Sequence, residues 1–121
     1  MNTEVCTTNL IHKEKVATIK KNLINNDLST LLVLGKCFSD YSRIKIFYAL
    51  ETYKEMCVCD LAAVLDASMA TTSHHLHFLK KHGVAKSRQD GKIVYYSFAN
   101  EDVFSAVRAF LNTSENLSMK L

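Results

Sequence analysis

The part of the sequence that most constrains the fold lies in the second half of the chain. An apolar run over 61–65 predicts a short helix, and a polar break at 66–68 separates it from a second helix predicted over about 70–82. Two runs with strand character, 84–88 and 93–98, follow. The Asp-Gly pair between them favours a tight hairpin, because both residues tolerate positive φ. This order predicts a helix-turn-helix with a β-hairpin wing.

Four other segments have the apolar spacing of helices. They cover about residues 11–25, 28–34 and 42–53, and the segment that follows Asn100. Asp27, Asp40 and Asn100 stand where helices begin, and each has a side chain suited to capping a helix N-terminus. We therefore expect a mainly α-helical fold with a β-hairpin wing (α+β), namely a winged helix-turn-helix.

We expect two parts in the chain. Residues 1–10 form a flexible arm that carries Cys6, and residues 11–121 form the winged helix-turn-helix domain with its terminal helices. The N-terminus lacks the basic and apolar regions of a signal peptide, and no apolar stretch approaches about 18 residues. We expect no membrane partner and a cytoplasmic location, where four cysteines favour metal binding or redox chemistry over structural disulfides.

The positive charge of the chain is concentrated rather than large. The formal net charge is only +3, which by itself does not indicate a nucleic-acid partner. Between residues 80 and 92, however, a single acid, Asp90, stands among Lys80, Lys81, Lys86, Arg88 and Lys92. A basic segment on a nearly neutral chain is typical of a surface that contacts phosphates.

The second predicted helix and the hairpin tip carry the candidate DNA contacts. Short hydroxyl side chains near the helix start can approach base edges, and lysine and arginine neutralise phosphates. The candidates for double-stranded DNA are Ser68, Thr71, Thr72, Ser73, His74, His75, His77, Lys80, Lys81, Arg88, Gln89 and Lys92. A solvated polar face on an ordinary helix is the alternative.

Cys57 and Cys59 are the strongest candidates for metal ligands. Residues i and i+2 point about 200° apart within a regular helix, so both thiols can reach one ion only where the backbone is irregular or entering a helix. Their position just before the short helix meets that condition. Cys6 is the obvious third thiolate, while Cys37 lies among apolar residues and is a weaker candidate. Such a set suits a soft ion, Cd²⁺, Pb²⁺ or Zn²⁺; core packing of the pair is the alternative.

The histidine cluster suggests another class of protein. His74 and His77 stand at i and i+3 with His75 beside them, a spacing that zinc enzymes use. No water-activating glutamate or further ligand accompanies them in the pattern, so we expect contact with DNA instead and no enzymatic activity.

Three stretches together resemble the ArsR/SmtB family of metalloregulators over roughly residues 28–112. Glu55-Met56-Cys57-Val58-Cys59-Asp60-Leu61 is similar to its metal-box signature. Ser73-His74-His75-Leu76, followed by Leu79, is similar to its recognition helix, and Asp90-Gly91-Lys92 before Tyr95-Tyr96-Ser97 is similar to its wing. Among members, the sequence most resembles the CadC-type cadmium- and lead-responsive repressors.

The resemblance implies a homodimer that binds operator DNA without metal and releases it with metal. In the CadC-type pattern, metal-box thiolates of one subunit join arm thiolates of the other. Here Cys57 and Cys59 match the box and Cys6 matches one arm cysteine, but residues 7–10 contain no second one. This favours a three-thiolate site, or a fourth ligand that is water, a carboxylate or another residue.

The resemblance also concerns the last helix. Some members bind Zn²⁺ there through histidines, but no histidine follows His82 in this sequence. That second site should be absent or crippled, with Asp102 left as a weak metal candidate. The apolar stripe formed by Val103, Phe104, Val107, Phe110 and Leu111 should serve dimerisation together with the first helix. The stripe could instead be core of the monomer.

Three other readings of the sequence stay open. The cysteines could pair as disulfides in a redox-responsive repressor, or the histidines could form a zinc enzyme. The domain could also be a protein-interaction module without DNA. The sequence does not rank Cd²⁺, Pb²⁺ and Zn²⁺, and arsenite also suits three thiolates.

Overall fold

The computed structural model describes residues 11–118; the predicted arm with Cys6 lies outside the described residues. The chain divides into two compact units, Met1–Leu32 and Val33–Leu121. The elements in chain order are α2 (Lys13–Asn25), α3 (Ser29–Phe38), α4 (Tyr41–Tyr53), β1 (Glu55–Cys57), α5 (Val58–Leu65), α6 (Met69–Lys81), β2 (Ala85–Asp90), β3 (Ile93–Phe98) and α7 (Glu101–Ser118). The predicted mainly α-helical fold with a β-hairpin wing is confirmed.

The first unit holds α2 and the start of α3. No residue of α2 is buried, and its apolar side chains Ile19 and Leu23 are more than half exposed. Asp27 supports the start of α3 as predicted, because its Oδ1 accepts a hydrogen bond from the Ser29 backbone N–H at 2.9 Å. Gly35 does not interrupt α3, which continues to Phe38.

In the second unit, α4 begins at a capping residue and supplies much of the core. Asp40 Oδ1 accepts the Arg43 backbone N–H at 3.1 Å, so this predicted cap is confirmed. Arg43 in turn donates from Nη2 to the Lys36 carbonyl at 2.8 Å, satisfying a carbonyl near the end of α3. The apolar face of α4 is formed by Ile46, Phe47, Ala49 and Leu50, all buried.

Helices α5 and α6 form the predicted helix-turn-helix. Asp66, with a left-handed φ of 52°, ends α5. Ser68 then caps α6, accepting the Thr71 N–H on its Oγ at 3.0 Å. At the other end Gly83 takes a φ of 76°, which favours glycine, and stops the helix.

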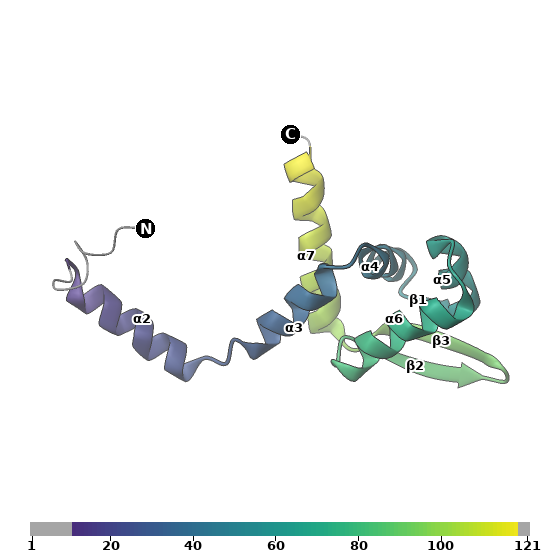
Figure 1. Cartoon of the computed structure of the whole chain (residues 1–121), viewed down its shortest axis with the longest axis horizontal. Helices are drawn as coiled ribbons and strands as arrows, with labels where there is room; N and C mark the ends of the chain where they lie inside the picture. The colour runs from purple at the N-terminus through teal and green to yellow at the C-terminus, as the bar shows by residue number, and fades with distance from the viewer. Residues whose placement is uncertain (1–10, 119–121) are drawn as a thin grey trace. The chain divides into compact units, whose positions relative to one another are not determined.

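The hairpin that follows is part of a three-stranded antiparallel sheet with the order β1-β3-β2. Asp90 pairs with Ile93, so the loop holds only Gly91 and Lys92, and Gly91 has a φ of 62°. A glycine with positive φ at the first central position suits a two-residue hairpin. The β2–β3 hairpin, here called the wing, extends beyond α6 on the side where α6 begins (Figure 1). The strand β1 was not predicted.

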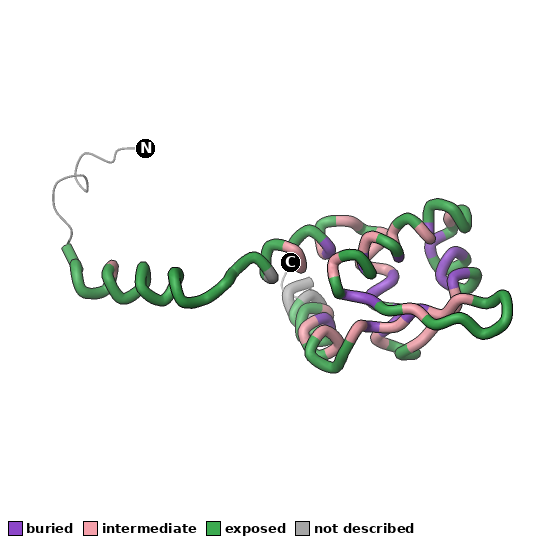
Figure 2. The backbone as a smooth tube through the Cα atoms, turned by 90° about the horizontal axis from the view of Figure 1, so that it is seen from below, coloured by how far each residue is buried: buried purple, intermediate pink, exposed green. Residues whose placement is uncertain are grey.

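The core lies between α4, α5, α6, the sheet and α7, whereas no residue of α2 is buried (Figure 2). The Phe47 ring lies 5.0 Å from that of Phe38 and 6.0 Å from that of Phe98. Val107 of α7 is completely buried. The prediction that Val107 belongs to a dimer face is therefore wrong, because it packs into the core of its own chain. Val103, Phe104 and Leu111 are half-buried against the same core, and Phe110 stays 56% exposed.

Replacing the Asp40 cap should destabilise the second unit. We expect Asp40→Ala to lower the free energy of unfolding by about 1 kcal/mol at neutral pH, with Asp40→Asn changing it far less because asparagine also caps. Denaturant unfolding at one fixed protein concentration measures both variants. Equal stability of Asp40→Ala and the wild type would contradict the capping role.

The same cap should respond to acid. Burial acts to raise the pKa of Asp40, but the Arg43 N–H bond and the charges of His75 and Arg43 outweigh it and lower that pKa. A carboxyl group whose pKa is lower in the folded state than in the unfolded state, where it is about 3.9, stabilises the fold at pH values above that unfolded pKa. This stabilisation is lost as the pH falls through the folded pKa. Below about pH 4, the free energy of unfolding of the wild type should therefore fall relative to that of Asp40→Asn.

Candidate metal pocket and nucleic-acid interface

Cys57 and Cys59 lie where the chain passes from a strand into a helix. Cys57 ends β1, pairs with Tyr95 of β3, and is also the N-cap of α5 with extended backbone angles (φ −79°, ψ 159°). Its side chain makes no capping hydrogen bond. Cys59 is the second residue of α5 and is exposed. The backbone transition that the Cys-x-Cys spacing requires is therefore present.

Both cysteines line one cavity of about 180 Å³, here called the metal pocket. Its other walls come from the start of α6 and from the end of the wing. The lining residues are Cys57, Val58, Cys59, Met69, Ser73, Lys92, Ile93 and Val94. The volume far exceeds the roughly 10–15 Å³ that one water needs. Two thiols on a shared cavity fit the donor chemistry of a soft metal ion.

The remaining metal candidates are placed less favourably. Cys37 is completely buried, and burial raises the pKa of its thiol although the charge of Arg43 opposes this. The structure thus argues against Cys37 as a metal ligand, because the thiolate is the form that binds metal and a buried thiol stays neutral. Asp102 is exposed in the first turn of α7. In the described part of the chain, no three His, Cys, Asp or Glu side chains gather as a metal site.

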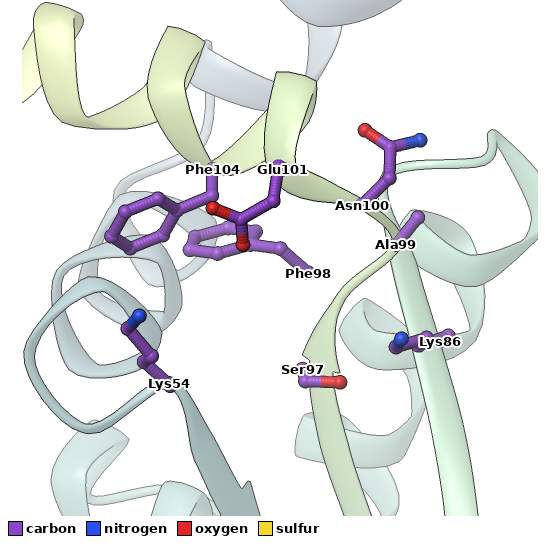
Figure 3. A pocket seen from close by; sticks show the side chains of 8 residues that line it. All are labelled: Lys54, Lys86, Ser97, Phe98, Ala99, Asn100, Glu101 and Phe104. Atoms are coloured by element: carbon purple, nitrogen blue, oxygen red, sulfur yellow. The ribbon is translucent and has the colours of Figure 1, made fainter.

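A larger cavity of about 390 Å³ lies elsewhere on the second unit, between the end of α4, the sheet and the start of α7 (Figure 3). Its lining includes Phe98 and Phe104, with the Lys54 Nζ 5.1 Å from the Phe104 ring. Neither cysteine nor histidine is among its lining residues. It therefore lacks the soft donors of the metal pocket.

The helix α6 presents three faces, because successive residues turn by about 100°. Thr72, Leu76 and Leu79 form the core face and are completely buried. Thr72 also donates its hydroxyl to the Ser68 carbonyl at 2.9 Å. The prediction that Thr72 contacts DNA is therefore corrected: its side chain has no access to a duplex. The opposite face carries Ala70, His74, His77 and Lys81, all exposed.

The two flanks of α6 contact its neighbours. On one flank the Phe78 ring lies 4.3 Å from the Arg43 guanidinium of α4. His75 is half-buried there, and its buried Nδ1 has no hydrogen-bond partner among the described residues. On the other flank Ser73 lines the metal pocket, and Lys80 donates from Nζ to Ser87 Oγ of β2 at 2.8 Å. His75 and Lys80 are thus partly engaged within the domain.

At the wing, Arg88 is held by the sheet rather than free. It donates two hydrogen bonds to the Glu55 carboxylate, at 2.8 and 2.7 Å, and its guanidinium lies 4.4 Å from the Tyr95 ring. These bonds lower the pKa of Glu55 and raise that of Arg88. Gln89 donates to the Gly91 carbonyl at 3.0 Å. Lys92 is the exposed cation of the turn itself.

Known proteins resemble this chain closely. Residues 40–87 match the model of a family described as "Bacterial regulatory protein, arsR family". The chain is 44% identical over 117 residues to the cadmium resistance transcriptional regulatory protein CadC of Listeria innocua, covering 97% of this chain and 98% of that protein. The chain belongs to the arsR family. A CadC homolog of Staphylococcus aureus is 42% identical over 120 residues, covering 98% and 99% of the two chains.

The fold agrees with that membership. The homodimeric winged helix-turn-helix DNA-binding domain Mb0332 of Mycobacterium bovis has a TM-score of 0.70 and 21% identity, covering 95% of each chain. This arsR-family chain is thus a transcriptional regulator with a winged helix-turn-helix fold, and not an enzyme. The zinc-enzyme alternative is therefore set aside. None of the described helices is both long and apolar enough to cross a bilayer.

Releasing Arg88 from Glu55 should strengthen DNA binding. Glu55→Gln removes one negative charge from the base of the wing and frees a guanidinium to reach phosphates. We expect tighter binding at low salt, and a slope of log K against log salt that is steeper by about 0.9 for one added phosphate contact. Glu51→Gln is the matched control, because it removes the same charge from α4, where the described residues show no ion pair for Glu51. An unchanged slope in Glu55→Gln would contradict this account.

Proposed function

We propose that this chain is a metal-responsive repressor. It binds operator DNA as a homodimer without metal and dissociates when a thiophilic ion, Cd²⁺, Pb²⁺ or Zn²⁺, binds to cysteine thiolates. The observation that carries the proposal is the lining of the metal pocket. Cys57 and Cys59 share that cavity with Ser73 of α6 and Lys92 of the wing. The metal donors and two candidate DNA contacts thus border one space.

The metal ligands are the thiolates of Cys57 and Cys59, joined by Cys6, which lies outside the described residues. Thiolates favour soft ions over hard ones such as Mg²⁺. Cadmium is the first choice, because the relatives from Listeria innocua and Staphylococcus aureus are named for cadmium resistance. Asp102 remains a weak candidate outside this set.

Operator DNA is contacted by the start and outer face of α6 and by the wing. In a helix-turn-helix the N-terminal part of the second helix meets base edges in the major groove. The accessible contacts are Ser68, Thr71, Ser73, His74, His77, Lys81, Gln89 and Lys92, with His75, Lys80 and Arg88 in supporting positions. The Ser68 hydroxyl donates to Thr71 Oγ1 at 3.0 Å, so these two side chains act as one polar group at the helix start.

Metal and DNA binding are coupled because they use adjoining groups. For an ion to release DNA, it must bind the DNA-free form more tightly than the DNA-bound form. A coupling free energy of about 1–3 kcal/mol is typical, and a strong switch needs more. Ser73 and Lys92 are the residues through which the metal pocket reaches the DNA surface in this proposal.

The homodimer buries apolar surface that one chain leaves exposed. In α2, Ile19 and Leu23 stand at i and i+4 and are 57% and 52% exposed. Phe110 of α7 is also exposed, although its ring lies 4.3 Å from that of Phe38. Large exposed apolar side chains at helical spacing favour an interface. A second copy is the partner we propose, since the Mycobacterium bovis neighbour is described as homodimeric.

The cysteine assignment is tested by Cys57→Ser and Cys59→Ser. Both variants should bind operator DNA as the wild type does, but release it only at Cd²⁺ concentrations on the order of 100-fold higher, or roughly 2.8 kcal/mol. Fluorescence anisotropy of a labelled duplex, followed with the ultraviolet thiolate-to-metal band, measures both steps. Cys37→Ala is the control cysteine and should respond as the wild type does.

Two outcomes would overturn the assignment. If Cys57→Ser and Cys59→Ser release DNA at the wild-type Cd²⁺ concentration, the pair does not hold the ion. If the reduced wild type ignores metal but releases DNA on oxidation, and a thiol reductant reverses this, the redox-responsive repressor is the correct function.

The dimer is tested on α2. We expect Ile19→Asp to shift the protein toward monomer in analytical ultracentrifugation, because a carboxylate in an apolar interface carries a desolvation cost. Asn22→Asp adds the same charge at an exposed polar position and should leave the dimer intact. A dimer that is unaffected by Ile19→Asp would exclude this face of α2 from the interface.

A further inference from the structure

Met69 is an exposed thioether at the start of α6. It is the first residue of the helix, directly after the cap Ser68, and 48% of its surface is accessible. On the helix it lies about 40° from Ser73, on the flank that faces the wing, since four residues turn about 400°. Burial in the core therefore does not account for this methionine.

Met69 lines the metal pocket together with both cysteines. The other lining side chains offer no comparable donor. Val58, Ile93 and Val94 are apolar, the ammonium of Lys92 has no lone pair, and the Ser73 hydroxyl is a hard oxygen. The thioether is thus the one soft donor that α6 contributes to this cavity, and thioethers bind soft metal ions.

The sequence leaves room for such a ligand. Cys57 and Cys59 supply two donors, and Cys6 is the single cysteine of the first ten residues. A soft ion prefers three or four ligands. Within the described residues, no third His, Cys, Asp or Glu joins the two thiols.

We propose that Met69 is a thioether ligand of the ion held by Cys57 and Cys59, and that it biases the site toward soft ions such as Cd²⁺ over Zn²⁺. This inference rests on the proposed metal-responsive function. It adds a direct link from the ion to the recognition helix of the same subunit. Because Met69 follows the Ser68 cap, the link acts on the first turn of α6, which carries the candidate base contacts.

The test uses the full-length protein with isotope-labelled methionine methyl groups. Titration with Cd²⁺ is followed by nuclear magnetic resonance, and the thiolate-to-metal band reports metal binding independently. Coordination should shift the Met69 methyl resonance in step with that band. Met56 is the internal control, because it lies in β1 beside Cys57 but packs against the core. Its resonance should move far less.

Met69→Leu supplies the second readout. Leucine has a similar volume, so the fold and metal-free DNA binding should be kept. We expect the affinity for Cd²⁺ to fall by about 10-fold or more, a loss that even outer-shell changes at metal sites produce. The affinity for Zn²⁺ should fall less. Met56→Leu is the matched control and should keep the wild-type affinity for both ions.

The outcomes separate this inference from the proposed function. If the wild type binds Cd²⁺ and releases DNA while the Met69 methyl stays unmoved, or if Met69→Leu keeps its Cd²⁺ affinity, the thioether is not a ligand and the repressor proposal stands. If the wild type shows no thiolate-to-metal band and no metal-dependent release, the proposed function fails first, and the ligand role of Met69 fails with it.

Discussion

The pairing of β1 with β3 is the interaction on which the arrangement of this domain depends. A strand of only three residues has little stability alone, and β1 is held because β3 is already paired with β2 on its other edge. The ladder places Cys57 opposite Tyr95, and Cys57 is also the N-cap of α5. The register of one short strand therefore fixes where the helix-turn-helix begins relative to the wing. A shift of one residue would turn the Cys57 side chain to the other face of the sheet.

The wing is anchored at its base and left free at its turn. Arg88 spans the sheet to Glu55 on β1, passing over the Tyr95 ring, and Lys80 ties α6 to Ser87. Exposed ion pairs contribute little stability, about 0–1 kcal/mol each. The Arg88–Glu55 ion pair and the Lys80–Ser87 hydrogen bond act here through geometry, since each holds a cation within the domain. Lys92 at the turn is exposed, so in the proposed function the basic segment divides into residues that anchor the wing and residues that contact phosphates.

Many of the helix ends and the hairpin turn could be predicted from local chemistry. The caps at Asp27 and Asp40 and the turn at Gly91 each act through near neighbours, so the sequence pattern alone located these positions. The strand β1 could not be found in this way, because its partner lies about 40 residues later and three residues show no periodicity. Thr72 and Val107 were misassigned for a related reason. The sequence pattern does not identify the surface that covers a side chain. A threonine near a helix start can face DNA or the core, and a valine in an apolar stripe can face a second subunit or the core of its own chain.

The cysteines show how backbone position decides the chemistry of identical side chains. Cys37 lies near the end of α3, packed into the core, where burial raises the pKa of its thiol and makes it a small apolar side chain. Cys57 and Cys59 stand at a strand-to-helix transition, where the backbone leaves its regular period and both thiols border one cavity. The same transition brings α5 against α6, so one wall of the cavity is the helix that we propose to contact DNA. In the proposed function, an ion bound here would act on α6 directly, because residues of α6 line the same cavity as the two cysteines.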